Sequence, residues 1–483
     1  MRYSLICNIL GMMSKYIGAL FIIPMFCAFL LKEANAIIPF LVTGAIAVVL
    51  GWILTVKKVE QKEIDNIKKS ESLATVFFAW ILFALICTIP YLFYGMDITN
   101  AVFEATSGVT TTGASIMDDY SVYPKTLFFF RSLTQWFGGM GIVVLFIAVL
   151  PRISVAGRQM FYAEAPTPTE DKPTPRIRYT ASWLWGIYFA LTIIELIILK
   201  FLGLDFFEAT ITSLSTIATG GFSHMQNSIY DFHNPQISLC VFIFMFIAGI
   251  NYILVYRGLK NKKITHIFKS EEFRGYFGIT LALGLMLALS LFINSHYEIK
   301  RALLNGFFEI TATMTSTGFA VDNYIKWDAT SKVILFLAFF TGGCAASTSG
   351  GIKIIRWIFI GKYLKRELNK IIHPQAIYPI KLEGAPVGQD IITQMVAFII
   401  FYLVIFALGA FLIVLIENNT TIAISSSAAA IGNIGPAFGT IGPMDSFNAL
   451  HNLTKWILIL LMLIGRLEII PFLAILNKDL WKN

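Results

Sequence analysis

The chain has 483 residues, of which 57% are hydrophobic and 14% charged, and its mean hydropathy is +0.72. Because a soluble domain carries about 25% charged residues, these proportions exclude a protein whose surface faces only water, and they predict an all-α polytopic membrane protein. The net charge of +8 favours basic cytoplasmic loops beside the anionic headgroups of a lipid bilayer over the binding of nucleic acid.

Ten segments are apolar enough, and long enough at roughly 20 residues, to cross the hydrocarbon of a bilayer as helices. The first two form an N-terminal hairpin, which we expect to stay in the protein because no small-residue cleavage site follows the first apolar run cleanly. The predicted spans are 5–30, 37–56, 72–95, 127–150, 181–202, 236–256, 275–294, 332–352, 391–416 and 454–475.

Basic residues are unevenly divided between alternate loops. One set of four loops holds 23 lysines and arginines, and the other set holds four. Lysine and arginine accumulate in cytoplasmic loops, so we expect the basic set and both termini in the cytoplasm. The basic loops are 57–71, 151–180, 257–275 and 353–390, and the other loops are 96–126, 203–235, 295–331 and 417–453.

Each of the four outer loops starts with a mildly apolar stretch and then reaches a glycine. The stretches are too short to cross the bilayer, and such stretches beside full spans predict re-entrant helices. They cover 100–112, 206–219, 302–317 and 421–434.

The four glycine corners resemble one another. Three read small residue, threonine, glycine, and the fourth keeps the glycine alone. Glu104, Glu208 and Glu309 belong to matching lead-ins and lie 9, 12 and 9 residues before the corner glycine, so we expect an extra turn or a shifted motif in the second unit. The corners are Thr111-Thr112-Gly113, Ala218-Thr219-Gly220, Ser316-Thr317-Gly318 and Asn433-Ile434-Gly435.

This internal repeat predicts a hairpin followed by four helix–pore-loop–helix units. The hairpin with its cytoplasmic loop covers 1–71, and the units cover 72–180, 181–274, 275–390 and 391–483.

Glycine corners at membrane depth are typical of a pore for ions. Non-helical backbone is tolerated there when it is buried or lines a water-filled cavity, and glycine adopts a positive φ freely. Carbonyl oxygens turned toward an axis can replace the hydration shell of a small cation, and the lead-in glutamates would attract cations. The alternative is four ordinary extracellular turns, against which the repetition of the motif on the charge-poor side argues.

The corner motifs resemble those of the Trk/Ktr/HKT superfamily of cation transporters, and specifically the membrane subunit of bacterial Trk-type potassium uptake systems. The resemblance covers nearly the whole chain, including the N-terminal hairpin. It implies a potassium-selective filter around a pseudo-fourfold axis, K+ as the transported ion with no further cofactor, and a place in the bacterial inner membrane. Its most specific marks are SGVTTTGAS at 107–115, STIATGGFSH at 215–224, TSTGFA at 315–320 and GNIGPAFG at 432–439.

The resemblance also implies which backbone atoms hold the ions. Serine at the first corner is associated in related plant transporters with sodium permeation, so Gly113 favours potassium. The fourth corner departs from the pattern because it lacks threonine. The implied filter glycines are Gly113, Gly220, Gly318 and Gly435, and the implied ion-binding carbonyls are those of Thr112, Thr219, Thr317 and Ile434 and of the preceding Thr111, Ala218, Ser316 and Asn433.

The predicted eighth span contains eleven consecutive small or polar residues at 341–351, four of them glycine. Each glycine costs a helix about 1 kcal/mol relative to alanine. We therefore expect an unwound, mobile segment rather than a helix-packing face of small residues. The resemblance implies an intramembrane loop that closes the path below the filter, with Gly342, Gly343, Ser347, Ser349, Gly350 and Gly351 as its gate residues.

Arg466 lies inside the last predicted span, where a charge is costly and a functional role is the first hypothesis. The alternatives are a structural pair with Glu468 or a side chain that reaches the interface. The resemblance implies that Arg466 stands near the pore axis, against the intramembrane loop, as a barrier to cations. Glu195 lies about one turn from Lys200 in the fifth span, and we interpret it as a boundary charge near the outer end.

Neither the loop at 151–180 nor the loop at 353–390 contains a nucleotide-binding motif of its own. The resemblance implies that a cytoplasmic ring of nucleotide-binding (RCK-type) regulatory subunits docks on these loops, and that the membrane subunit forms a homodimer.

Three hypotheses for the function remain open. The first is potassium uptake through a gated, channel-like pore, and the second is an ion-coupled (H+ or Na+) potassium symporter, for which a two-repeat pattern is more usual. The third is a membrane enzyme, which we do not expect, because the six histidines form no metal spacing and the spans hold no nucleophile beside a base. The five cysteines lie at irregular spacing in apolar stretches and predict buried thiols.

Overall fold

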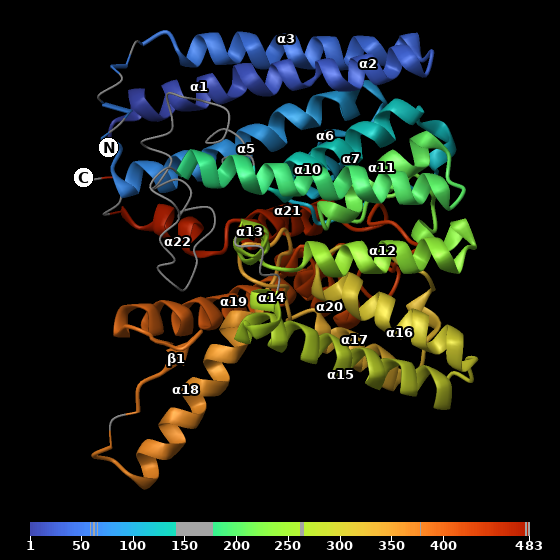
Figure 1. Ribbon diagram of the computed structural model, residues 1–483. Helices are drawn as coiled ribbons and strands as arrows, with labels where there is room; N and C mark the ends of the chain where they lie inside the picture. The colour runs from blue at the N-terminus through green and yellow to red at the C-terminus, as the bar shows by residue number, and fades with distance from the viewer. Residues whose placement is uncertain are drawn as a thin grey trace.

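A computed structural model describes residues 1–57, 59–60, 63–64, 66–141, 177–260, 265–376, 378–478 and 481. Within these ranges the secondary structure is helical, apart from one short antiparallel pair formed by β1 (Lys381–Leu382) and β2 (Ala385–Pro386). The predicted all-α fold class is confirmed. Most of the long helices run along one direction, whereas α18 (Ile354–Ile372) projects from the bundle at a steep angle, and the two chain ends lie at the same end of the bundle (Figure 1).

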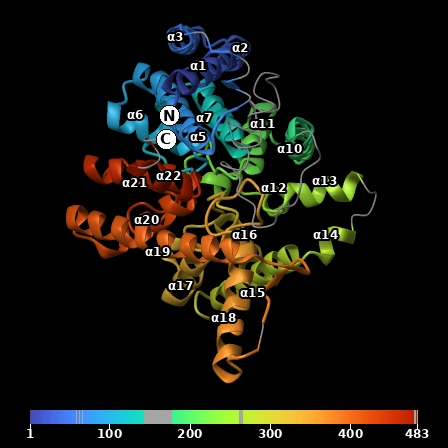
Figure 2. The ribbon, with the colours of Figure 1, turned by 90° about the vertical axis from the view of Figure 1, so that its left-hand side faces the viewer.

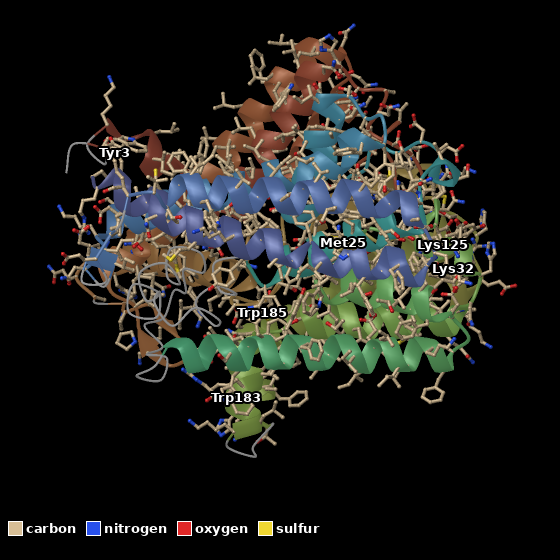
Figure 3. All side chains as sticks on the ribbon, turned by 90° about the horizontal axis from the view of Figure 1, so that it is seen from above. Tyr3, Met25, Lys32, Lys125, Trp183 and Trp185 are labelled. Carbon is tan, nitrogen blue, oxygen red and sulfur yellow. The ribbon has the colours of Figure 1, made fainter. Side chains whose placement is uncertain are left out.

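The N-terminal hairpin is held together by glycines. Its first arm comprises α1 (Tyr3–Leu20) and α2 (Ile22–Leu30), and its second arm comprises η1 (Ala34–Ala36) and α3 (Ile37–Leu54). A Cβ atom added to Gly18 would lie 2.8 Å from the carbonyl oxygen of Gly44, so the two backbones are in direct contact. Figure 3 shows the hairpin from above, with Lys32 at its turn and beside Lys125. Small residues that allow close approach are typical of helix pairs in membranes.

Four units follow, each with a long helix, a short buried helix and a second helix. Figure 2 shows the units placed in turn around a centre, with the hairpin outside the first unit. The first unit has α5 (Lys69–Phe93), α6 (Ile98–Val109) and α7 (Lys125–Gly139); the second has α10 (Ile177–Phe201), α11 (Phe206–Ile217) and α12 (Pro235–Ala248); the third has α15 (Glu271–Ile293), α16 (Ile299–Met314) and α17 (Ala329–Ala338); the fourth has α19 (Gln389–Glu417), α20 (Thr420–Gly432) and α21 (Asn452–Arg466).

Shorter helices connect these units. Three 3-10 turns lie in the outer loops and four α-helices lie beyond the second helices of the units. They are η2 (Tyr120–Val122), η4 (Ser228–Phe232), η5 (Tyr324–Lys326), α13 (Tyr252–Lys260), α14 (Thr265–Lys269), α18 (Ile354–Ile372) and α22 (Ile470–Leu476).

Six helical stretches in the described part of the chain are long and apolar enough to cross a membrane, and they confirm six of the ten predicted spans. The other predicted spans fall on the second helices of the units. Continuous helices were expected at 236–256 and 454–475, but α12 and α13 meet at 86° and α21 ends at Arg466. In 332–352, α17 gives way to non-helical backbone at the predicted unwound segment. The six confirmed stretches are Tyr3–Leu30, Ala34–Leu54, Ser70–Phe93, Ala181–Phe201, Glu271–Ile293 and Ile391–Glu417.

The second helices stop where backbone from elsewhere occupies the space. A Cβ atom on Gly139, at the end of α7, would lie 2.9 Å from the Cα atom of Ala218, and one on Gly465 would collide with the carbonyl oxygen of Ile431. The prediction of continuous helices at 236–256 and 454–475 is therefore wrong, whereas the break in 332–352 is the one that the sequence predicted. The predicted span 127–150 is helical to Gly139, but 142–150 and most of the predicted docking loop, 151–176, lie outside the described residues.

We predict that Gly18→Val destabilises the hairpin, because the new side chain would meet the backbone of α3. Overpacking of this kind costs about 1–3 kcal/mol, which should lower the melting temperature of the detergent-solubilised protein by several degrees. Gly186→Val in α10 is the matched control, since a Cβ atom there meets nothing within 4 Å. An equal loss in both variants would show that helix propensity, and not helix contact, is responsible.

Candidate functional site

The short helices α6, α11, α16 and α20 end at the four predicted corners. Three of them begin with a side chain that accepts hydrogen bonds from free N–H groups of the first turn, which are Asp97 for α6, Asp205 for α11 and Asn419 for α20. Such caps fix where a helix starts. Because each corner follows the C-terminal end of its helix, the partial negative charge of the helix dipole faces the corner.

The backbone of each corner repeats the same conformation. One residue adopts a left-handed φ of 52–56°, and two residues later a glycine has a φ of 72–99°. Positive φ at both positions reverses the chain tightly, which glycine allows without steric cost. The left-handed residues are Thr111, Thr219, Ser316 and Asn433, and the glycines are Gly113, Gly221, Gly318 and Gly435.

This repetition corrects the predicted alignment of the second corner. Gly221, and not Gly220, occupies the position of Gly113. Gly220 takes the middle position that threonine or isoleucine fills elsewhere, and Ala218 lies one residue before the corner, as the C-cap of α11. The segment 218–221, ATGG, contains two glycines. Aligning its first three residues with Thr111-Thr112-Gly113 led to the prediction of Gly220 as the corner glycine, where the structure has Gly221.

Each corner glycine packs against the carbonyl group of the next corner. A Cβ atom on Gly113 would collide with the carbonyl oxygen of Gly220, and one on Gly435 would lie 2.5 Å from the carbonyl oxygen of Thr112. Gly221 and Gly318 face the carbonyl oxygens of Thr317 and Ile434 in the same way. The contacts run from the first corner to the fourth and back to the first. We call this closed arrangement, residues 111–113, 219–221, 316–318 and 433–435, the corner ring.

A cavity, here called the outer vestibule, opens on the corner ring. The glycines of the first three corners and Pro436 of the fourth line it. Asp445 contributes an acidic side chain to its wall. Asp445 stands in a loop without any motif, so the sequence offered no signal for its position.

Two of the three lead-in glutamates lie behind their corners and do not line the outer vestibule. Glu104 and Glu309 are buried, and their carboxylates accept hydrogen bonds from the N–H groups of Ile116 and Val321, each at 2.9 Å. Both N–H groups lie three residues after the corner glycine, so these glutamates hold their corners from behind. Their expected role in attracting cations stays a prediction.

The second and fourth corners lack this glutamate. Ser425 replaces it in the fourth unit, where its hydroxyl accepts a hydrogen bond from the N–H group of Phe438 at 3.1 Å. Glu208 is displaced toward the start of α11, where it accepts from the N–H group of Asp205 at 3.0 Å and completes a capping box. Of the two explanations expected for the second unit, the structure shows the shifted motif.

Arg131 of α7 joins the first two corners. Its fully buried guanidinium forms an ion pair with Glu104 at 2.7 Å and donates to Ser115 Oγ at 3.0 Å. It also donates to the carbonyl oxygen of Ser223 at 3.2 Å and lies 4.1 Å from the centroid of the Phe222 ring. Ser115, Phe222 and Ser223 lie within two residues of a corner glycine, and Glu104 holds the first corner through Ile116. One side chain therefore fixes two corners relative to each other.

His224 follows the second corner in the outer loop. Its ring packs between Phe207 and Phe232, and Glu208 lies 3.9 Å from its Nε2 atom. Burial lowers the pKa of His224 below its ordinary value of about 6.5. Burial therefore favours the neutral imidazole beside the second corner.

Residues 341–353 are non-helical between α17 and α18, which confirms the predicted unwound segment. This intramembrane segment touches the corner ring from the side opposite the vestibule. The N–H group of Gly350 donates to Ser316 Oγ at 2.6 Å, and the Thr348 hydroxyl donates to the carbonyl oxygen of Ile217 at 3.2 Å. Gly350 also lies against the carbonyl oxygen of Gly432.

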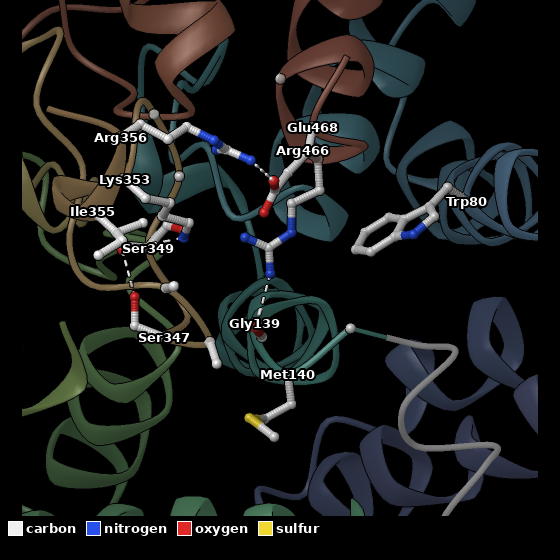
Figure 4. A pocket seen from close by; sticks show the side chains of 16 residues that line it. Trp80, Gly139, Met140, Ser347, Ser349, Lys353, Ile355, Arg356, Arg466 and Glu468 are labelled. Carbon is white, nitrogen blue, oxygen red and sulfur yellow. Dashed lines mark hydrogen bonds and ion pairs between the residues drawn. The ribbon is translucent and has the colours of Figure 1, made fainter. Parts of the chain in front are cut away.

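Arg466 crosses from α21 to this segment. Its guanidinium donates to the carbonyl oxygen of Thr348 at 3.0 Å. It also donates to the carbonyl oxygen of Gly139, at the end of α7, at 2.8 Å (Figure 4). Glu468 accepts a hydrogen bond from Arg356 at 2.5 Å. Arg466, Ser347, Ser349, Gly350 and Gly351 line one cavity, which we call the inner cavity. The structure thus brings together the predicted gate residues, of which Gly342 and Gly343 lie just behind the cavity wall, against Gly350 and Ser349.

Comparison with known proteins places these features in a family. A family model described as TrkH, cation transport protein, matches residues 39–480. The chain belongs to this family. It is 34% identical to the Trk system potassium uptake protein TrkH of Escherichia coli over the full length of both chains, and 30% identical to the TrkG protein of the same organism over 95% of each chain. The crystal structure of the potassium transporter TrkH from Vibrio parahaemolyticus superposes with a TM-score of 0.89 at 30% identity, and covers 100% of both chains.

Membership of the TrkH family makes the chain a membrane transport protein and not an enzyme, as predicted. Across the described ranges, no group of three or more histidine, cysteine, aspartate or glutamate side chains could hold a metal ion. All five cysteines are free thiols; Cys87, Cys240 and Cys344 are buried as predicted, whereas Cys7 and Cys27 are partly exposed.

Glu195, a charged residue of this TrkH-family chain, does not lie at the helix end where the sequence analysis placed it. Glu195 of α10 is fully buried, so its interpretation as a boundary charge is wrong. Lys200 does not neutralise it, since Lys200 Nζ donates to the carbonyl oxygen of Leu204 at 3.2 Å. The sequence shows that Glu195 belongs to a membrane-spanning helix. It does not show which face of that helix packs against α11.

We predict that Glu104→Gln destabilises the protein strongly, because Arg131 would keep a buried charge without its counter-charge. Breaking a buried ion pair costs about 3–5 kcal/mol, which should appear as a large fall in melting temperature in detergent. Glu367→Gln, which removes the partner of Arg366 and Lys370 at the surface, is the control, and exposed pairs contribute about 0–1 kcal/mol. Similar effects of the two substitutions would contradict the structural role of the buried pair.

Proposed function

We propose that this protein takes up potassium across the bacterial inner membrane through a selective, gated, channel-like pore that passes through the corner ring. The observation that carries the proposal is the closure of four glycine corners into one ring, between an outer vestibule and an inner cavity. A ring of backbone carbonyl groups without protruding side chains is the arrangement that replaces the hydration shell of a cation. The relatives that match over the full length are potassium uptake proteins.

The proposed ion ligands are carbonyl oxygens of the ring. They belong to the left-handed residue and the middle residue of each corner, and the helix dipoles that end at the corners favour a cation there. For the second corner the proposal therefore moves from Ala218 and Thr219 to Thr219 and Gly220. The proposed ligands are the carbonyl groups of Thr111, Thr112, Thr219, Gly220, Ser316, Thr317, Asn433 and Ile434.

The intramembrane segment is the proposed gate. It lies beneath three of the four corners, and Arg466 adds a positive charge to the wall of the inner cavity. A fixed cation in a space of low dielectric repels passing cations strongly. Hydrogen bonds from Arg466 to the carbonyl groups of Thr348 and Gly139 would hold the segment in the path, so the gate opens when these bonds break.

The remaining expectations from the resemblance belong to this proposal. Both termini face the cytoplasm, in agreement with their place at one end of the bundle (Figure 1) and with the excess of basic residues on that side. The basic loops dock a ring of nucleotide-binding regulatory subunits, and two copies of the chain form a homodimer. The competing proposal is a symporter in which H+ or Na+ is coupled to potassium.

The reversal potential of the purified protein in proteoliposomes separates the two mechanisms. In a potassium gradient at symmetrical pH and sodium, a channel-like pore gives a potential that follows the potassium gradient alone. When a proton or sodium gradient is then added, a symporter shifts the potential by a fixed stoichiometry, and a selective pore does not. Absence of potassium-dependent flux altogether would overturn both proposals.

We predict that Gly113→Ser weakens discrimination against sodium, because its side chain would displace the Gly220 carbonyl group from the ring. A change of about 1.4 kcal/mol corresponds to a tenfold change in the sodium-to-potassium permeability ratio, and we expect an increase of about that size. Gly203→Ser is the control: Gly203 also has a positive φ in an outer loop, but a Cβ atom there meets nothing within 4 Å. An unchanged ratio in Gly113→Ser would remove this corner from the selectivity mechanism.

We predict that Arg466→Ala raises potassium flux in proteoliposomes severalfold, because it removes both one of the positive charges that line the inner cavity and the bonds from Arg466 to the intramembrane segment. Arg366→Ala on α18, a cation outside the cavity, should leave the flux unchanged. Flux that stays constant or falls in Arg466→Ala, with the protein still folded, would exclude Arg466 from the gate.

A further inference from the structure

The second corner lacks the internal supports of the other corners. In the first and third corners the middle residue is a threonine, Thr112 or Thr317, and its hydroxyl forms a hydrogen bond of 2.7 Å with the threonine two residues earlier. The corresponding positions in the second corner are Gly220 and Ala218, which have no hydroxyl group. Within the described chain, α11 also supplies no acceptor like Glu104, Glu309 or Ser425 for the N–H group three residues after the corner glycine.

A side chain from the preceding unit fills this gap. Gln135 of α7 is fully buried, and its Nε2 donates to the carbonyl oxygen of Gly220 at 2.6 Å. Its Oε1 accepts a hydrogen bond from the N–H group of Phe222 at 3.0 Å. The nitrogen and the oxygen of the Gln135 amide are therefore both hydrogen-bonded, to the residue before Gly221 and to the residue after it.

The same side chain explains why residue 220 is glycine. The φ angle of Gly220 lies outside the left-handed region, so its backbone would accept any residue. A Cβ atom at Gly220 would instead run into the amide of Gln135, at 2.6 Å from Oε1 and 2.8 Å from Nε2. The amide of Gln135 occupies the volume that the threonine side chain fills in the first and third corners.

We propose that Gln135 is a positioning residue for the second corner: its amide replaces the missing threonine side chain and sets the direction of the Gly220 carbonyl group, and thereby the selectivity of the ring. This inference rests on the proposed function, since it assigns that carbonyl group to the ion path. Gln135 lies one helical turn after Arg131, which holds the carbonyl group of Ser223. Together these two side chains of α7 support the segment 220–223 from outside its own unit.

The inference makes Gly220→Thr and Gln135→Ala complementary. Gly220→Thr alone places two side chains in one volume, and Gln135→Ala alone leaves the Gly220 carbonyl group without its donor. In the double variant Gln135→Ala/Gly220→Thr, the threonine side chain enters the vacated space, as in the first and third corners. Each single change should raise the sodium-to-potassium permeability ratio at least fivefold, and the double variant should recover most of the parent's selectivity.

The experiment measures bi-ionic reversal potentials in proteoliposomes for the parent, both single variants and the double variant, with the melting temperature of each in detergent. Gln135→Met, which keeps the volume of the side chain but not its hydrogen bonds, separates packing from positioning. Gln394→Met, on the exposed face of α19, is the matched control. Gln135→Met should change the ratio at least fivefold while Gln394→Met leaves it unchanged.

Two results would overturn the inference. In a selective parent, an unchanged permeability ratio in Gln135→Met with a lowered melting temperature would show that Gln135 serves stability alone. A double variant as unselective as the single variants would show that threonine does not replace the amide, and this comparison holds even where one single variant fails to fold. A parent that does not select potassium contradicts the proposed function itself, which distinguishes that failure from a failure of the inference.

Discussion

The contact between each corner glycine and the carbonyl group of the next corner determines the rest of the structure. Since no Cβ atom fits at Gly113, Gly221 or Gly318, the backbones alone set the spacing of the ring. A backbone in this conformation has no regular ladder of hydrogen bonds to hold it. Supporting bonds must come from behind the ring, and Glu104, Arg131, Gln135 and Glu309 are buried there.

These supports work because they are buried. Hydrogen bonds and ion pairs are stronger in a medium of low dielectric, and an unpaired partner there is correspondingly costly. Arg131 meets this requirement with a carboxylate, a hydroxyl, a carbonyl group and the face of the Phe222 ring. The buried charge of Arg131 therefore fixes the positions of two loops. Apolar residues at the same place could not form these directed bonds.

The features that could be predicted from the sequence are those for which the residue types allow few alternative structures. Four glycine corners on the charge-poor side and a run of small residues at 341–351 admit few structures at membrane depth, and both predictions agree with the fold. Hydropathy could not distinguish a continuous span from a half-length helix, because the residues beyond α12 or α21 are as apolar as a helix requires. The position of the second corner depends on Gln135, which lies 85 residues before Gly220, and the two adjacent glycines gave no local signal for choosing between them.

The ring is fourfold in its backbone but not in its supports. The first, third and fourth corners are held by their own short helices, through Glu104, Glu309 and Ser425, whereas the second is held by α7 of the first unit. The intramembrane segment adds a further asymmetry, because Gly350 bonds directly to Ser316, a residue of the third corner. Any movement of that segment must break this bond or carry Ser316 with it. The inner cavity and the ring are therefore mechanically connected at the third corner, while the first corner, anchored to Arg131, can stay in place.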